Sequence, residues 1–195
     1  MNIGAIAAAF TEGLRKADAS RPVWTSRSGR LYLAGIGPHP ESKVVEKVLS
    51  SAPGLAAVSR TEVPYPNGRQ TCDLVLNAGS HDAVWIEVKM ARLAGDNGKA
   101  DDTAIKDILS PYPDDRSALT DCTKLLEAPV DCSKAILIYG FDWLPNKPIE
   151  PLIDEFEGVA ATRVRLSDRV AYRFRDFVHP VHCQGCVYAW AITPK

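Results

Sequence analysis

Two neighbouring apolar runs that carry charged side chains, residues 71–77 and 84–90, constrain the fold of this chain most. Apolar runs of this length, bounded by polar turn residues, are typical of adjacent β-strands joined by a tight connection. Because side chains alternate along a strand, Glu87 and Lys89 share one face of the second strand. If the two strands pair through the polar turn, Asp73 and Glu87 converge at one edge of the sheet with Lys89 beside them.

A partly buried pair of carboxylates repels itself unless a cation or a proton lies between the two groups. Mg²⁺ suits such a pair because it takes one or two protein carboxylates and leaves its other positions to water and phosphate. The sequence therefore predicts an Mg²⁺ or Mn²⁺ site held by Asp73 and Glu87, with the ammonium group of Lys89 nearby. The alternative is an exposed sheet edge on which Glu87 and Lys89 form a solvated ion pair.

The spacing of Asp73, Glu87 and Lys89 resembles the motif of the PD-(D/E)XK nuclease superfamily. In that family the Asp and the Glu hold the metal ion and the Lys contacts the attacking water. The resemblance implies that these three residues are catalytic, that Asp73 and Glu87 are metal ligands, and that the backbone carbonyl of Val88 is a further ligand. One departure is that Cys72 stands where the family name places Pro.

The order of the expected elements supports the same resemblance. From residue 41 onward the sequence predicts a helix, three strands, a helix and a strand, which matches the αβββαβ core of restriction-endonuclease-like proteins over about a hundred residues. The predicted fold class is thus α/β, with a mixed central sheet flanked by helices. We expect a single domain over residues 1–195, with an N-terminal helix at 2–17, the core at about 41–140 and a C-terminal β-rich extension at about 148–195.

Two helices offer further candidates for the site. Glu41 falls on the apolar face of the helix at 41–51. The resemblance implies an acidic residue on the helix before the strands, so Glu41 is expected to be an auxiliary metal ligand or a contact of a metal-bound water; the alternative is a favourable charge at a helix N-terminus. The resemblance also implies that the helix after the motif lends a polar residue to the site, here Lys124, as a substrate contact, or Asp121. The alternative for both is a solvated helix flank.

Arginines near the C-terminus are candidates for binding the substrate. The sequence predicts a hairpin with strands at 162–166 and 170–177, and alternation puts two arginines on one face of each strand. Such a group of guanidinium ions binds phosphates without regard to sequence. Neutralisation by nearby Glu155, Glu157, Asp168 and Asp176 is an equal alternative. The arginines are Arg163, Arg165, Arg173 and Arg175.

The chain has five cysteines, an odd number at irregular spacing, which argues against a disulfide framework and for a reducing cytoplasm. A possible zinc site consists of Cys183 and Cys186 with His179 and His182 just upstream. This run is more compact than most structural zinc sites. A reduced turn between two terminal strands is therefore the favoured interpretation, and zinc the less favoured one.

The net charge of −1 excludes a wholly basic nucleic-acid binder, so any affinity for nucleic acid must come from local patches. No apolar segment is long enough to span a bilayer, and the apolar N-terminal run is short and lacks a basic start, so we expect no membrane association. The leading hypothesis is an Mg²⁺-dependent nuclease that hydrolyses phosphodiester bonds in DNA. The alternative is a catalytically inactive relative of these nucleases that binds nucleic acid or a protein, such as an accessory or immunity-type partner. Whether the chain forms a homo-oligomer stays open.

Overall fold

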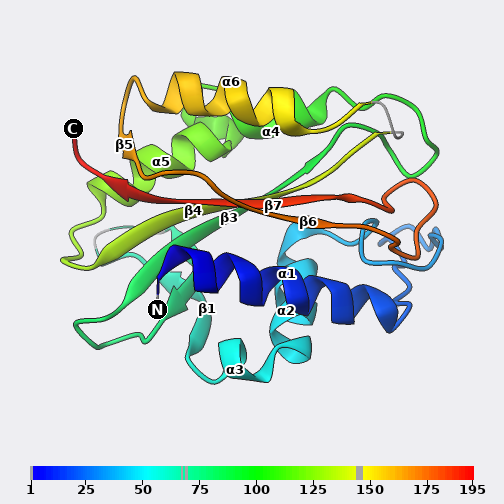
Figure 1. The fold of residues 1–195 in the computed structure, drawn as a ribbon, viewed down its shortest axis with the longest axis horizontal. Coiled ribbons are helices and arrows are strands. Elements are labelled where there is room, and N and C mark those ends of the chain that lie inside the picture. Colours follow the sequence, from blue (N-terminus) through cyan, green and yellow to red (C-terminus); the bar gives the residue numbers. More distant parts are fainter. Residues whose placement is uncertain (1, 67, 69, 144–146) are drawn as a thin grey trace.

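A seven-stranded mixed sheet organises the chain in the computed structural model, which describes residues 2–66, 68, 70–143 and 147–195 (Figure 1). The strand order is β1-β2-β3-β4-β7-β5, and β6 also pairs with β7. β3 and β4 are parallel, whereas the other pairs are antiparallel. The strands are β1 (Ser59–Pro64), β2 (Thr71–Leu76), β3 (Val84–Arg92), β4 (Ser133–Phe141), β5 (Arg165–Leu166), β6 (Val170–Phe174) and β7 (Gly185–Thr193).

Helices cover both faces of this sheet, so the class is α/β (Figure 1). On one face lie α1 and α2; α1 buries Ile6, Phe10 and Leu14, which recur at the helical period. On the other face lie α4, α5 and α6. No described helix combines the length and the apolar character that crossing a membrane requires. The helices are α1 (Ile3–Ala19), α2 (Glu41–Ser51), α3 (Pro53–Ala56), α4 (Thr103–Leu109), α5 (Ala118–Glu127) and α6 (Glu150–Ala160).

From α2 to β4 the chain follows the expected order of helix, three strands, helix and strand, with α3 and α4 as short insertions. Beyond residue 148 the chain is rich in strands, as expected, but β7 does not extend the sheet from outside. It pairs with β4 on one side and with β5 and β6 on the other, and its Tyr188 and Trp190 are almost fully buried. Residues of the expected extension thus form an interior strand of the same sheet.

The sequence pattern predicts a helix at 115–126 with Asp114 and Asp115 as candidate caps, whereas α5 begins at Ala118. Ser117 is the N-cap, since its Oγ accepts a hydrogen bond from the N–H of Thr120 at 3.2 Å. Asp115 lies in a 3₁₀ turn instead, where its carboxylate accepts from Ser110 Oγ and pairs with Lys106. A serine hydroxyl is as good a cap as a carboxylate, so the sequence pattern alone did not choose between the two.

The feature that positions the site is the place where β2 and β3 part. Their pairing runs from Leu76–Val84 to Leu74–Ile86 and stops there, although β3 continues to Arg92 beside β4. From Glu87 onward, β3 therefore has an edge that β2 does not cover. The N-terminus of α2 and the first turns of α5 approach this edge from opposite faces of the sheet.

Candidate functional site

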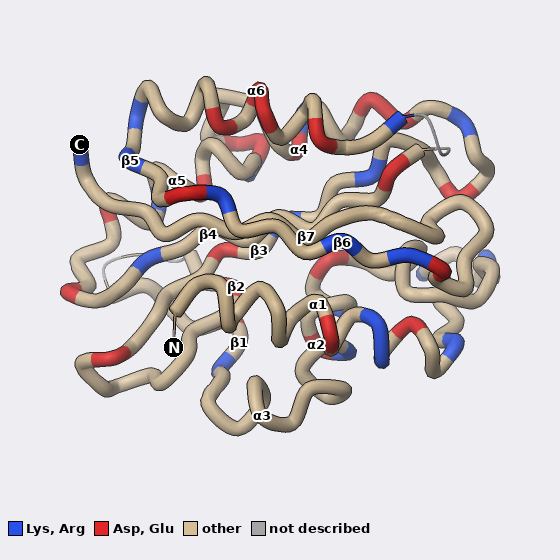
Figure 2. Tube along the Cα trace, in the orientation of Figure 1, with Lys and Arg blue, Asp and Glu red and all other residues tan. Residues whose placement is uncertain are grey.

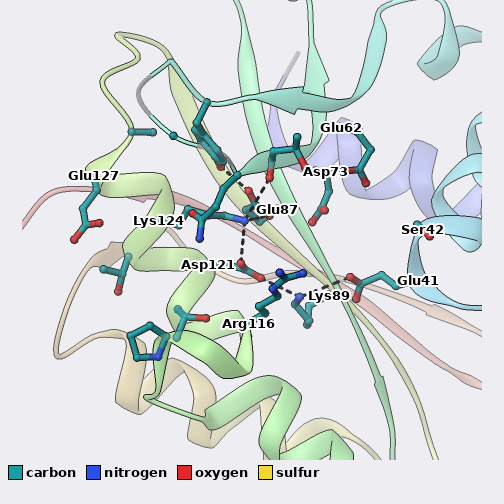
Figure 3. A pocket seen from close by; sticks show the side chains of 18 of the residues that line it. Glu41, Ser42, Glu62, Asp73, Glu87, Lys89, Arg116, Asp121, Lys124 and Glu127 are labelled. Atoms are coloured by element: carbon teal, nitrogen blue, oxygen red, sulfur yellow. Dashed lines mark hydrogen bonds and ion pairs between the residues drawn. The ribbon is translucent and has the colours of Figure 1, made fainter.

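A cavity of about 850 Å³ opens where β2 and β3 part (Figure 3). Its wall combines side chains from β2, β3, α2 and α5, and so draws on both helical layers. Its mouth carries exposed groups of both signs, among them Glu127, Arg116 and Arg163. Four carboxyl groups and two ammonium groups point toward one another inside it: Glu41, Asp73, Glu87, Asp121, Lys89 and Lys124 (Figure 3).

Two of the carboxylates accept hydrogen bonds from backbone N–H groups of β3 that β2 leaves unpaired. The N–H of Val88 donates to Asp73 Oδ2 at 2.8 Å, and the N–H of Met90 donates to Glu41 Oε2 at 2.5 Å. Both donors belong to the edge of β3 that β2 leaves uncovered, so the carboxylates satisfy backbone groups that otherwise lack partners. The N–H and C=O of one strand residue point to the same side, which directs the Val88 carbonyl toward Asp73 as well.

Glu87 is the most deeply buried acid of the pocket, with 1% of its surface exposed. The hydroxyl of Tyr65 donates to Glu87 Oε1 at 2.5 Å, and Lys124 Nζ lies 3.0 Å from Glu87 Oε2. The ring of Tyr65 packs against that of Trp85 with the centroids 5.0 Å apart. The two oxygens of Glu87 therefore have different partners, an aromatic hydroxyl and an ammonium group.

Asp121 connects the two lysines (Figure 3). Its Oδ1 lies 3.2 Å from Lys124 Nζ and its Oδ2 lies 3.1 Å from Lys89 Nζ, which is also 3.6 Å from Glu41 Oε1. The contact between Asp121 Oδ2 and Lys89 lacks the geometry of a hydrogen bond, so among the described residues this buried oxygen has no donor. With four carboxyl and two ammonium groups, the pocket has an excess of acid.

Burial and mutual repulsion make these acids hard to ionise. Burial, together with the negative charges of Asp73 and Asp121, raises the pKa of Glu87 to about 8. Burial likewise raises the pKa of Glu41 to about 7. For Lys89, burial alone would lower the pKa, but the carboxylates of Glu41 and Asp121 outweigh it and raise the pKa above its ordinary value. Without a further cation, the site favours protonated acids and charged lysines.

The structure brings the predicted Asp73, Glu87 and Lys89 into one pocket, together with Glu41 and Lys124. The alternative of a solvated Glu87–Lys89 pair is wrong, because Glu87 is buried and its cationic partner is Lys124. The alternative of a solvated helix flank is wrong for Asp121, which is 4% exposed.

Sequence reasoning missed Tyr65 altogether. It stands between β1 and β2 in a turn, and no local pattern indicates that its ring folds beneath Glu87. Only an indirect argument could have predicted Tyr65. A buried carboxylate needs a hydrogen-bond donor, and the hydroxyl of a tyrosine close in sequence to the strand of a predicted metal ligand can supply one.

The four predicted arginines do not form one surface. β5 and β6 do not pair with each other as a hairpin, because each pairs with β7, at opposite ends of it. Only Arg163 lines the pocket, at its mouth. Arg173 is neutralised by Asp142 at 3.2 Å and Glu150 at 3.3 Å, and acidic residues recur along α6 above it (Figure 2). Arg165 and Arg175 are exposed and lie outside the pocket.

The proposed zinc ligands do not converge either. Cys186 lies within β7 and packs with the side chains under α4–α6, whereas the ring of His182 packs on Phe141 at 5.3 Å, on the face covered by α1 and α2. The rings of His179 and His182 are stacked with their centroids 4.7 Å apart, and His182 Nε2 is bonded to Asp96 at 3.1 Å. A compact sequence run that crosses from one face of a sheet to the other cannot surround one ion.

The acidic pocket fits Mg²⁺ or Mn²⁺ by its chemistry. It offers carboxylate oxygens, one of them without a hydrogen-bond donor, and a backbone carbonyl on the same side, which are the ligands that hard divalent ions take. In the part of the chain that the structure describes, no three His, Cys, Asp or Glu side chains already stand as a complete metal centre. The ammonium groups of Lys89 and Lys124 lie between the carboxylates in the arrangement observed.

Comparison with known proteins identifies no relative: no protein-family model matches the chain, and neither the curated proteins nor the solved structures give a significant match.

Proposed function

We propose that this chain is an Mg²⁺-dependent nuclease of the PD-(D/E)XK type that hydrolyses phosphodiester bonds in DNA. The observation that carries the proposal is the gathering of Asp73, Glu87 and Lys89 in one pocket at the parting of β2 and β3. The surrounding elements follow one another along the chain in the order expected of a restriction-endonuclease-like core. Glu41 from α2 and Lys124 from α5 complete the pocket.

The charge of the pocket supports a requirement for a metal ion. Four carboxyl groups outnumber two ammonium groups inside the pocket, so the pocket repels a phosphate diester while its acids are ionised. A divalent cation held by Asp73, Glu87 and the Val88 carbonyl would remove that repulsion. When bound, the ion would supply Lewis-acid polarisation of the phosphate and acidify a water molecule.

The residues of the chain itself would orient the reactants. Lys89 is held by Glu41 and Asp121 inside the pocket, where its ammonium group donates to the attacking water or to a phosphate oxygen. Lys124 lies nearer the mouth and offers a second ammonium group to a phosphate oxygen. Tyr65 keeps the Glu87 carboxylate in one orientation.

The test is cleavage of plasmid and single-stranded DNA with Mg²⁺ or Mn²⁺ by the wild type and by Asp73→Asn, Glu87→Gln and Lys89→Ala. We expect each substitution to lower the rate by about 100-fold or more, as for the loss of a metal ligand or proton-handling group. Glu127→Gln, at the exposed mouth, serves as the matched control and should cleave like the wild type. Equal cleavage by all variants would indicate a contaminating nuclease.

A second candidate function is an inactive binding module with the same fold. The observation in its favour is that Lys89 and Lys124 already neutralise the acids that would hold the ion. In that case the lysines are structural, and removing one should unfold the protein rather than alter a reaction. If the folded wild-type protein binds the divalent ion and still cleaves none of the substrates, this function is favoured over the nuclease.

A further inference from the structure

The loop formed by residues 21–35, here called the 21–35 loop, has an unusual composition for a chain of net charge −1. It contains Arg21, Arg27 and Arg30 and no acidic residue. Arg27 and Arg30 are exposed, and no ion pair among the described residues involves either of them. Arg169 and Arg173 are neutralised by acids, and the other exposed arginines without such a partner, such as Arg165 and Arg175, are not gathered in one loop. The 21–35 loop is therefore a local source of uncompensated positive charge.

The 21–35 loop is held in a defined ribbon. Thr25 and Leu31 form an antiparallel bridge, and the N–H of Tyr32 donates to the carbonyl of Trp24 at 3.0 Å. The Trp24 ring packs on the buried His39, with centroids 5.6 Å apart. The arginines of the 21–35 loop therefore project from an anchored backbone. Binding of a ligand then costs less conformational entropy of the loop.

The base of the 21–35 loop is tied to the body of the protein. The N–H of Gly35 donates to the carbonyl of Pro22 at 2.8 Å, and the N–H of Ile36 donates to the buried Asp18 at 2.9 Å. Beyond it, the carbonyl of Gly37 accepts from Arg92, the last residue of β3, at 2.8 Å. The chain then enters α2 at Glu41, inside the acidic pocket, so the loop adjoins the elements that build the pocket (Figure 1).

The outer face of this ribbon is apolar. Val23, Leu31 and Leu33 are 52%, 68% and 60% exposed, and they make up half of the large apolar side chains that are exposed in the described residues. Because Thr25 pairs with Leu31, these three side chains lie on one face of the ribbon. Contiguous exposed apolar side chains flanked by polar groups are characteristic of binding surfaces.

We propose that the 21–35 loop binds nucleic acid, with Arg27 and Arg30 on phosphates and with Leu31 and Leu33 against sugars and bases. The identity of the partner rests on the function proposed above. Two observations favour it: the charge is complementary to phosphate, and the Arg30 guanidinium lies over the Tyr32 ring, 4.7 Å from its centroid, which places a cation beside an aromatic face on which a base can stack. The ammonium groups of the pocket are already paired with its carboxyl groups, so binding of further phosphates needs such a separate surface.

The test is the fluorescence anisotropy of labelled single-stranded and duplex DNA in EDTA, so that no cleavage occurs. For the variant Arg27→Gln/Arg30→Gln we expect affinity to fall about tenfold or more, and the slope of log affinity against log salt to become smaller by about 2. Leu31→Ser/Leu33→Ser should weaken binding and leave that slope unchanged. The charge-matched control, Arg165→Gln/Arg175→Gln, removes two exposed arginines elsewhere and should bind like the wild type.

Wild-type affinity in the loop variants, or an equal loss in the control, would overturn the inference. So would loop-dependent binding to vesicles of phosphatidylserine and phosphatidylcholine with DNA binding unchanged by the loop variants. The two proposals fail separately. Loop-dependent DNA binding by a protein that cleaves nothing would refute the nuclease alone, and cleavage with loop-independent binding would refute the DNA-binding loop alone.

Discussion

At the scale of single residues, the environment of Glu87 is the most informative part of the molecule. Its carboxylate is buried, yet each oxygen has a different partner, Tyr65 on one side and Lys124 on the other. The hydroxyl cannot leave without the Tyr65 ring, which is packed on Trp85, whereas the flexible lysine can. Glu87 therefore presents one oxygen, Oε2, to whatever cation enters the pocket.

We predict that Tyr65→Phe disturbs the orientation of the Glu87 carboxylate while the protein stays folded. The substitution removes one buried hydrogen bond and keeps the ring, so the free energy of unfolding should fall by about 1 kcal/mol. Because Glu87 then loses its fixed orientation, the Mg²⁺ concentration for half-maximal activity should rise several-fold, with a smaller effect on the rate at saturating Mg²⁺. Urea denaturation and Mg²⁺ titrations of activity measure the two effects.

The matched control for this prediction is Tyr112→Phe, which removes an exposed hydroxyl near the same pocket. It should change neither stability nor the Mg²⁺ requirement. If Tyr65→Phe lowers stability and leaves the Mg²⁺ requirement unchanged, Tyr65 supports the fold without orienting Glu87.

Residue-level patterns predicted Asp73, Glu87 and Lys89 because charges within apolar strands are conspicuous in a sequence. They did not predict the burial of Asp121, because a polar residue beside a helical stripe points to solvent unless another element covers it. In this protein, Lys89 on the edge of β3 that β2 leaves unpaired covers Asp121. That contact depends on where α5 sits over the sheet, which no local pattern encodes.

At the scale of elements, the site depends on how α5 is placed. Ser117 caps this helix and is fully buried, and its Oγ also donates to the carbonyl of Ser110 at 2.5 Å. The cap thus fixes the start of α5 against the preceding loop, and with it the positions of Asp121 and Lys124 one and two turns later. The predicted cap at Asp115 would have shifted the helix start by two residues.

We predict that Ser117→Ala destabilises the protein by about 1 to 2 kcal/mol, the usual cost of a lost N-cap with a buried hydrogen bond. Guanidinium denaturation monitored by circular dichroism measures it. Ser28→Ala, in an exposed turn, is the control and should cost nothing measurable. An unchanged denaturation midpoint in Ser117→Ala would mean that packing alone fixes the start of α5.

At the scale of the whole molecule, the order of strands in the sheet was beyond the reach of sequence patterns. Alternation and apolar runs predicted most strands, but strand pairing is decided by contacts between distant segments. β7, from the C-terminal region, has β4 on one side and both β5 and β6 on the other, because its two faces are apolar and are covered by helices on both sides. The predicted hairpin of strands 162–166 and 170–177 was wrong for the same reason, because both segments pair with β7 and not with each other.

The buried acids should give the metal-free protein a characteristic dependence on pH. Burial raises the pKa of Glu87 from 4.5 to about 8 and that of Glu41 from 4.5 to about 7. Burial disfavours the charged form of Lys89 and Lys124, but nearby carboxylates outweigh it and raise both pKa values, so the lysines stay charged throughout. Between about pH 4.5 and pH 8, these two acids therefore hold more protons in the folded protein than in the unfolded chain.

We therefore predict that these acids lower the free energy of unfolding in EDTA as the pH rises from about 4.5 to about 8, by on the order of 3 kcal/mol, whereas burial of His179, which lowers its pKa to about 4, acts in the opposite direction below about pH 6.5. Glu87→Gln should remove much of this slope, because the amide does not titrate. Adding Mg²⁺ at about pH 8 should restore stability to the wild type. A pH dependence of stability that is the same in Glu87→Gln and in the wild type would contradict the assignment of raised pKa values.

Joint binding of a divalent ion by Asp73 and Glu87 is tested most directly by calorimetric titration with Mn²⁺ and Mg²⁺. We predict binding to the wild type at millimolar or lower concentrations, an affinity at least about tenfold weaker in Asp73→Asn and in Glu87→Gln, and wild-type affinity in Glu127→Gln. Absence of binding to the folded wild type, or equal affinity in all four proteins, would contradict the claim.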